Sequence, residues 1–166
     1  MNKIKIIYIG TDKWANCLKE ICSQKNIQIK KCFIPKLGGE LHELCQRFDI
    51  PFKVSKNINY NYEDIKNINF DLYVVIGHPF LLKKNLLKLN PGLGFHPTKL
   101  PLRRGRAPIN WLIIDGLKKT ALTIFKLGLE ADDGDLLFQE DILIKKSETA
   151  ITLIKKIDKT LKNNIV

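Results

Sequence analysis

The sequence predicts an α/β protein whose core is an open, mostly parallel, twisted β-sheet with helices on both faces. Short β-rich runs alternate with segments in which apolar residues recur at helical spacing, and this rhythm is typical of such sheets. The run 72–76 is apolar at every position, as expected of a parallel strand that is covered on both faces. The length of 166 residues suits one domain.

The first elements are bounded by glycine and proline. A β-rich Lys/Ile alternation predicts a strand at 3–9, which ends at Gly10 and Thr11. Apolar residues at helical spacing then predict a helix over 14–22. A second β-rich run predicts a strand at 27–34, which a proline ends.

The middle of the chain repeats the alternation. Helical spacing over 41–48 precedes a short strand at 51–54. The stretch 57–69 is polar and rich in asparagine, and it predicts a loop with a short helix. The buried strand at 72–76 follows, and helical spacing returns over 80–89.

The last third of the chain contains the remaining elements. A short strand at 93–95 leads directly into a histidine and a proline. A helix is predicted at 107–116, followed by strands at 117–127 and 136–144. An amphipathic helix at 149–162 closes the pattern.

The loops at the carboxyl ends of the strands are the candidate ligand sites, because open α/β sheets bind ligands there. They are 10–11, 77–79 and the segment that begins at His96. The G-x-G-x-x-G pattern of dinucleotide sites is absent. The turn at 10–11 resembles a mononucleotide-binding loop only weakly, and the alternative is a tight turn with Thr11 or Asp12 as helix N-cap.

The charge balance is strongly basic. The chain has 28 Lys and Arg against 17 Asp and Glu, a formal net charge of +11. A positive field favours anionic partners such as nucleotides, nucleic acid or polyanionic cofactors. The alternative is a Lys-rich surface without a dedicated partner, since the lysines are spread along the chain.

The remaining composition excludes several classes of protein. The four cysteines lack C-x-x-C spacing, so reduced, buried thiols are expected. Three scattered histidines argue against a Cys/His metal cage. No apolar run reaches the roughly 18 residues of a membrane span, and no secretory signal precedes the first strand. We therefore expect a cytoplasmic protein, with Trp14 and Trp111 as packing residues.

The densest concentration of chemistry-bearing residues lies between 92 and 139. His96 ends a short strand and is held by two prolines nearby, in the kind of rigid loop that positions catalytic groups. The acidic turn 130–135 offers a carboxylate that could orient His96 and keep it protonated. Each element alone is ambiguous, because a single histidine is often structural and an Asp-Asp-Gly-Asp run is often only a turn.

Three motifs occur here in a characteristic order: His-Pro-Thr-Lys-Leu-Pro at 96–101, Arg-Gly-Arg-Ala-Pro at 104–108 and Asp-Asp-Gly at 132–134. The chain resembles the folate-dependent formyltransferase family, whose signature is N-x-H-P-S-L-L-P, R-G-x-x-P and D-x-G. The opening strand and its Gly-Thr turn are also similar, so the resemblance extends from about 3 to 162. It implies a Rossmann-like formyltransferase fold in a single catalytic domain over 1–166, with no added C-terminal domain.

The resemblance implies roles for individual positions. His96 takes the place of the catalytic histidine, and Asp132 that of the aspartate paired with it. The implied formyl donor is N10-formyltetrahydrofolate, with its pterin among 75–80 and 127–132. The positions implied for the donor are Ile76, Gly77, His78, Thr98, Leu100, Pro101, Glu130 and Asp132. The positions implied for the acceptor are Gly10, Thr11, Arg104, Gly105, Arg106 and Asn110, with the arginines placed to contact phosphates.

The chain departs from the family pattern at two positions. Gly94 stands where the family has an asparagine, and Asn110, His78 or a water are the candidates to replace its amide. The strand before the acidic turn reads Thr-Ile-Phe, with Phe125 in the third place, where tRNA and purine members tend to have T-x-H. This difference looks more like the sugar N-formyltransferases.

The expected reaction is formyl transfer to the amino group of a nucleotide-linked amino sugar. Protonated His96 would stabilise the oxyanion that forms when the amine attacks, and Asp132 would maintain that proton. Formyl transfer to aminoacyl-tRNA or glycinamide ribonucleotide is the alternative, and a non-catalytic folate- or nucleotide-binding domain is another. No nucleic-acid motif accompanies the positive charge, which argues against a nucleic-acid-binding module. A homodimer is left open.

Overall fold

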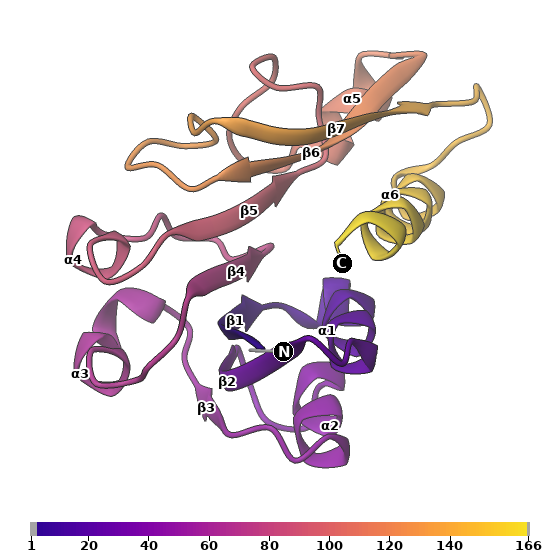
Figure 1. Ribbon diagram of the computed structural model, residues 1–166. Helices are drawn as coiled ribbons and strands as arrows, with labels where there is room; N and C mark the ends of the chain where they lie inside the picture. Colours follow the sequence, from indigo (N-terminus) through magenta and orange to yellow (C-terminus); the bar gives the residue numbers. More distant parts are fainter. Residues whose placement is uncertain (1–2, 166) are drawn as a thin grey trace.

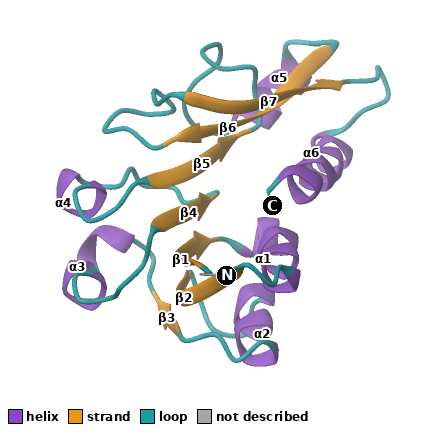
Figure 2. Ribbon diagram, viewed as in Figure 1, coloured by secondary structure: helices purple, strands orange, loops and turns teal. Residues whose placement is uncertain are grey.

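The structure, a computed structural model, describes residues 3–165. One seven-stranded sheet runs through the molecule and is flanked by helices (Figures 1 and 2). Its strands are β1 (Ile4–Gly10), β2 (Ile27–Ile34), β3 (Phe52–Val54), β4 (Leu72–Ile76), β5 (Gly92–His96), β6 (Lys119–Lys126) and β7 (Leu136–Leu143). The predicted α/β class is confirmed.

The strand order is β3-β2-β1-β4-β5-β6-β7. The first five strands of this order are parallel, and β6 and β7 are antiparallel to their neighbours. The sheet grows from β1 in one direction through β2 and β3 and in the other through β4. This reversal between β1 and β4 creates the switch point beside which open sheets bind ligands.

Helices cover both faces of the sheet. One face packs against η1 (Asp12–Trp14), α1 (Ala15–Ser23), α2 (Glu40–Arg47), α5 (Pro108–Ile114) and α6 (Ala150–Asn164). The other packs against η2 (Ile58–Tyr60), α3 (Tyr62–Ile65) and α4 (Lys84–Leu87). The view in Figure 1 shows α1, α2 and α6 on the opposite side of the strands from α3 and α4.

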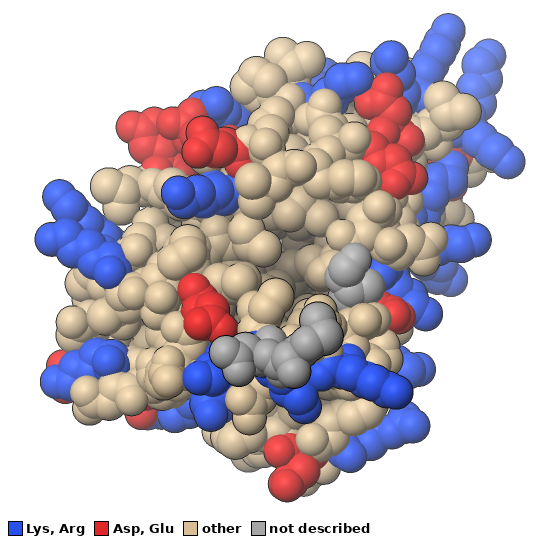
Figure 3. All heavy atoms as spheres, in the orientation of Figure 1, with Lys and Arg blue, Asp and Glu red and all other residues tan. Residues whose placement is uncertain are grey.

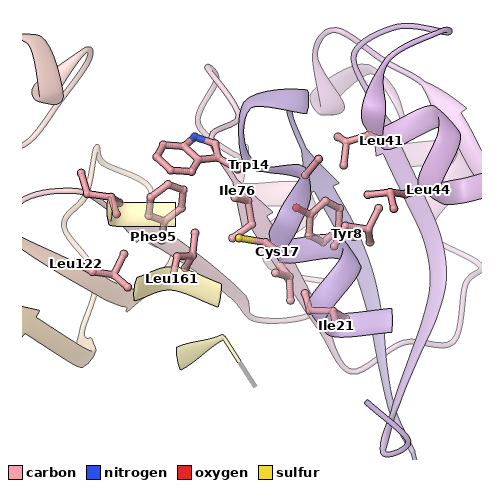
Figure 4. Close-up of a cluster of buried hydrophobic side chains, with 14 of the residues drawn as sticks. Tyr8, Trp14, Cys17, Ile21, Leu41, Leu44, Ile76, Phe95, Leu122 and Leu161 are labelled. Carbon is pink, nitrogen blue, oxygen red and sulfur yellow. The ribbon is translucent and has the colours of Figure 1, made fainter. Parts of the chain in front are cut away.

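Alternate residues of β1 face two separate cores, because successive side chains of a strand point to opposite faces. Ile6 and Tyr8 belong to the larger core and Ile9 to the smaller one. Figure 4 shows part of the larger core, where Trp14 lies beside Phe95. The two rings meet edge to face with their centroids 4.9 Å apart.

The prediction that both tryptophans pack is half correct. Trp14 is buried, and it connects the start of α1 to β5. Trp111 is 56% exposed on α5, so its assignment as a packing residue is wrong. The apolar spacing of α5 is satisfied by Ile109 and Leu112, which are the buried side chains of that helix.

The predicted helix at 80–89 is mostly wrong, since α4 spans only Lys84–Leu87. The side chain of Asn59 forms hydrogen bonds with the backbone that precedes α4. Its Oδ1 accepts from the Lys83 N–H at 2.8 Å, and its Nδ2 donates to the Leu81 carbonyl at 2.9 Å. The backbone at 80–83 is thereby held outside a helix, although its apolar spacing is helical.

Two boundaries also differ from their predictions. Thr11 precedes η1 without a side-chain capping bond, and Asp12 does not cap it either. Asp12 Oδ1 instead accepts from the Leu41 N–H at 3.0 Å, at the start of α2. The strand predicted at 117–127 starts only at Lys119, because Gly116 turns the chain with a φ of 61°.

The four cysteines are free thiols, and Cys17, Cys32 and Cys45 are buried. Burial raises the pKa of the partly buried Cys22 to about 11, which keeps that thiol protonated and unreactive. Lys and Arg side chains form several separate groups on the face shown in Figure 3. Within residues 3–165, no helix combines the length and apolarity that crossing a membrane requires.

Candidate active site

A cavity of about 350 Å³ lies at the carboxyl ends of the central strands. Residues that follow β1, β4 and β5 line it, together with the end of β6 and the turn before β7. Loops at the carboxyl ends of strands are where open α/β sheets are expected to bind ligands. From the loop after β1, however, the lining residues are Lys13 and Trp14, and not Gly10 or Thr11.

His96 ends β5 and reaches this cavity while only 5% exposed. Its Nε2 lies 2.9 Å from the Arg103 carbonyl oxygen, which can only accept, so Nε2 carries a proton and donates. Its Nδ1 lies 3.4 Å from Asp132 Oδ2. Both ring nitrogens therefore face acceptors, an arrangement that suits the doubly protonated, positively charged imidazole.

Asp132 is fixed by more than its histidine partner. Its Oδ2 also accepts from the Gly105 N–H at 2.8 Å. Its backbone lies in the left-handed region, with a φ of 51°, a conformation that costs energy for a residue with a Cβ. One carboxylate oxygen thus connects the turn before β7, the loop at 105 and the imidazole.

The arginine-rich loop is strained and held by ion pairs. Left-handed φ values occur at Arg103 (58°), Gly105 (98°) and Ala107 (52°). Arg103 forms an ion pair with Asp115, and Arg104 forms one with the neighbour of Asp132, Asp133. Arg106 is the arginine of this loop that lines the cavity.

The residues expected to contact the donor fall into two groups. Gly77, His78 and Glu130 line the cavity with Asp132. Ile76, Thr98 and Leu100 are buried outside its lining, and Pro101 is exposed. Thr98 Oγ1 donates to the Leu102 carbonyl at 2.9 Å, so its contribution is to shape the loop after β5.

The residues expected to contact the acceptor divide in the same way. Gly105 and Arg106 line the cavity, whereas Arg104 is engaged by its aspartate. Asn110 is exposed on α5 and lies outside the lining. Asn110 therefore does not replace, within the cavity, the side-chain amide that an asparagine at position 94 would provide.

His78 is a second histidine of the cavity in a different environment. Its Nε2 accepts from the Ile58 N–H at 3.5 Å, which leaves the proton of the neutral ring on Nδ1. Burial lowers the pKa of His78 to about 4. The cavity thus contains one neutral histidine and one histidine flanked by acceptors on both sides.

The two departures from the family pattern are cross-strand neighbours. Gly94 of β5 pairs with Phe125 of β6, and His96 pairs with Thr123. A Cβ at position 94 would lie 3.1 Å from Phe125 Cζ and 2.6 Å from Leu127 Cδ2. The space above Gly94 is therefore occupied by apolar side chains. Sequence reasoning noted both positions without their pairing, and it missed Lys13 as a cavity residue.

The fold and the cavity define an open α/β domain with a ligand-sized site at its switch point and a histidine–carboxylate pair placed for acid–base chemistry. Comparison of the sequence with protein families gives a match to "Formyl transferase" over residues 3–166. The chain belongs to this formyl transferase family.

Two curated relatives are methionyl-tRNA formyltransferases. That of Buchnera aphidicola is 27% identical over 172 aligned positions, covering 95% of this chain and 53% of that protein. That of Ehrlichia canis is 28% identical over 171 positions, covering 93% and 56%. The chain thus spans about half the length of these relatives. The expected likeness to sugar N-formyltransferases receives no support from them.

Solved structures share the fold. Phosphoribosylglycinamide formyltransferase from Bacillus halodurans superposes with a TM-score of 0.84 at 23% identity, covering 97% of this chain and 90% of that one. A formyltetrahydrofolate deformylase from Pseudomonas syringae gives 0.84 at 15% identity, covering 98% and 58%. At these identities the likeness establishes the common architecture.

Proposed function

We propose that this chain transfers a formyl group from N10-formyltetrahydrofolate to a primary amine, and that the amine is that of an aminoacyl-tRNA. Membership of the formyl transferase family supports the reaction. The acceptor is inferred from the methionyl-tRNA formyltransferases that match along more than nine-tenths of the chain. The nucleotide-linked amino sugar expected from Phe125 becomes the competing acceptor to be tested.

The cavity fits a flat heteroaromatic donor. Its volume lies at the lower end of the range of small-molecule sites. Pro79, Phe80 and Leu127 supply apolar walls, while His78 and Glu130 supply polar groups. Such a mixture of flat apolar surface and a few polar contacts suits a pterin ring. When bound, the donor would supply an activated formyl group.

The paired His96 and Asp132 are the observation that carries the proposal. Because Nε2 is engaged by the Arg103 carbonyl, Nδ1 is the nitrogen left to serve the cavity. Its 3.4 Å separation from Asp132 exceeds a normal N–H···O bond of about 2.9 Å. Nδ1–H can therefore donate to negative charge that develops on a carbonyl oxygen, while the carboxylate keeps the ring protonated.

Two positively charged side chains line the cavity. Lys13 and Arg106 both line it, and the Lys13 ammonium lies 5.1 Å from the centroid of the Trp14 ring. Lys13 is exposed overall, and partial burial lowers its pKa. Two cations at one cavity favour an acceptor that bears phosphate, which both a tRNA and a sugar nucleotide do.

Titration calorimetry with a stable N10-formyltetrahydrofolate analogue tests the donor. Micromolar binding is expected, and absence of binding would refute the proposal. Formyl transfer to methionyl-tRNA, glycinamide ribonucleotide and nucleotide-linked amino sugars then ranks the acceptors. His96→Ala should abolish transfer and retain analogue binding, whereas His42→Ala, which changes a histidine outside the cavity lining, serves as the control.

A further inference from the structure

The floor of the cavity beside His96 is made by a glycine and a phenylalanine on adjacent strands. Gly94 and His96 are two residues apart on β5 and therefore share one face of the sheet. Phe125 lies directly opposite Gly94 in the antiparallel pairing of β5 and β6. All three residues line the cavity. The phenylalanine ring is thus next to the proposed catalytic histidine.

This floor is closely packed. Phe125 is only 3% exposed, and its Cζ would lie 3.1 Å from a Cβ built at position 94. Carbon atoms at that distance are inside their optimal separation of about 3.5–4.0 Å. The ring therefore rests on the bare backbone of Gly94, and any side chain at 94 would have to displace it or its neighbour Leu127.

A transferring enzyme must choose between an amine and water. An oxyanion donor such as His96 stabilises the charge on the carbonyl oxygen whichever nucleophile attacks the carbon. In hydrolysis, the water oxygen would bond to the formyl carbon and the C–N10 bond would break. The nitrogen would take a proton, and the products would be formate and tetrahydrofolate. The choice must therefore come from groups that control which nucleophile reaches the carbon.

We propose that Phe125, seated on Gly94, excludes water from the reacting centre beside His96 and so directs the formyl group to the amine. This inference rests on the proposed function. An apolar floor offers water no hydrogen-bond partner, so a water placed there would lose bonds that it makes in bulk. The amine would depend less on that floor, because the Lys13 and Arg106 side chains that line the cavity are proposed to hold its substrate.

The test measures two products of one reaction: formate released by hydrolysis and formylated amine. Phe125→Ala should raise the ratio of hydrolysis to transfer at least tenfold, and Phe125→Leu should raise it by a smaller factor. Phe70→Leu is the matched control, because Phe70 is similarly buried at 5% exposure but does not line the cavity. Its ratio should equal that of the unchanged protein.

A second variant separates water exclusion from loss of stability. In the Phe125→Ala background, Gly94→Ala adds a methyl group where the ring rested, with the end of the Leu127 side chain, 2.6 Å from that Cβ, shifting to admit it. The added methyl group should lower the hydrolysis ratio again. A purely structural role for Phe125 predicts no such recovery. The leucine variant provides the same readout if the alanine variant does not fold.

The outcomes are distinguishable. A ratio that stays within twofold of the unchanged protein in both Phe125 variants, with transfer still measurable, overturns the water-exclusion role alone. Failure of the unchanged protein to bind the folate analogue or to formylate any amine overturns the proposed function, and this inference with it. A raised ratio that Gly94→Ala reverses supports both.

Discussion

Replacing Asp132 by asparagine tests the proposed chemistry with little change of shape. The amide side chain of the Asp132→Asn variant retains an oxygen that can accept from the Gly105 N–H, as Asp132 does at 2.8 Å. The same oxygen position faces Nδ1 of His96, so the contact keeps its shape and loses its negative charge. A neutral amide no longer favours the positively charged ring, and a neutral ring keeps its one proton on Nε2 for the Arg103 carbonyl, which leaves Nδ1 without a hydrogen to donate.

The size of the effect follows from the geometry. Two unit charges at 3.4 Å, the Nδ1–Oδ2 separation, attract by about 5 kcal/mol at an effective dielectric constant of about 20. Desolvation of the pair offsets part of this attraction. Loss of one oxyanion donor costs about 3–4 kcal/mol of barrier, and we therefore expect kcat of Asp132→Asn to fall by roughly 10²–10³.

Steady-state formyl transfer with separate determination of kcat and KM is the assay, supported by analogue titration and thermal unfolding. KM, analogue affinity and Tm should change little, because the loop contact survives. Asp133→Asn is the matched control, since Asp133 is the adjacent carboxylate and pairs with Arg104 at the surface. Its kcat should stay within a few fold. Equal losses in both variants, or an unchanged kcat in Asp132→Asn, would refute the assigned role.

Three further predictions concern pH and stability. Burial lowers the pKa of His78 to about 4 from the usual 6.5. Between these two pH values the His78 side chain is therefore mostly protonated in the unfolded chain and mostly neutral in the folded chain. Stability should therefore fall by up to about 3 kcal/mol as the pH drops from 6.5 to 4, and urea unfolding should show a smaller fall in His78→Gln. Gly77→Ala should lower Tm and weaken analogue binding, because φ is +72° and the new Cβ would lie 2.6 Å from Trp14 Cδ1; unchanged values would contradict this close approach. Thr149→Ala breaks the capping box that Thr149 and Thr152 form at the start of α6, and denaturant titration should show a loss of about 1 kcal/mol.

The sheet could be predicted well because its signals are local. The bounds of β2 and β4 agree with the predicted strands at 27–34 and 72–76, since runs of β-branched and apolar residues end at clear turn signals there. The helix predicted at 80–89 was mostly wrong because the side chain of Asn59, distant in the sequence, bonds to the backbone of this segment. Nothing in the spacing of 80–89 itself reports that contact.

The candidate site could be predicted in part from its three motifs, and its catalytic role stays a prediction. The His96–Asp132 pairing could be expected, and the structure brings the two side chains together. The position of Asn110 could not, because exposure depends on which face of α5 packs. The pairing of Gly94 with Phe125 also required the antiparallel register of β5 and β6, which a single sequence does not reveal.

The shared oxygen of Asp132 has a thermodynamic consequence. The same atom accepts from the Gly105 N–H and faces His96 Nδ1, so the free energy of docking the arginine-rich loop and that of protonating the imidazole are linked. Linkage is reciprocal: the coupling free energy is the same whichever of the two contacts is changed. An acceptor that displaces the loop at Gly105 would therefore also act on the contact between Asp132 and His96.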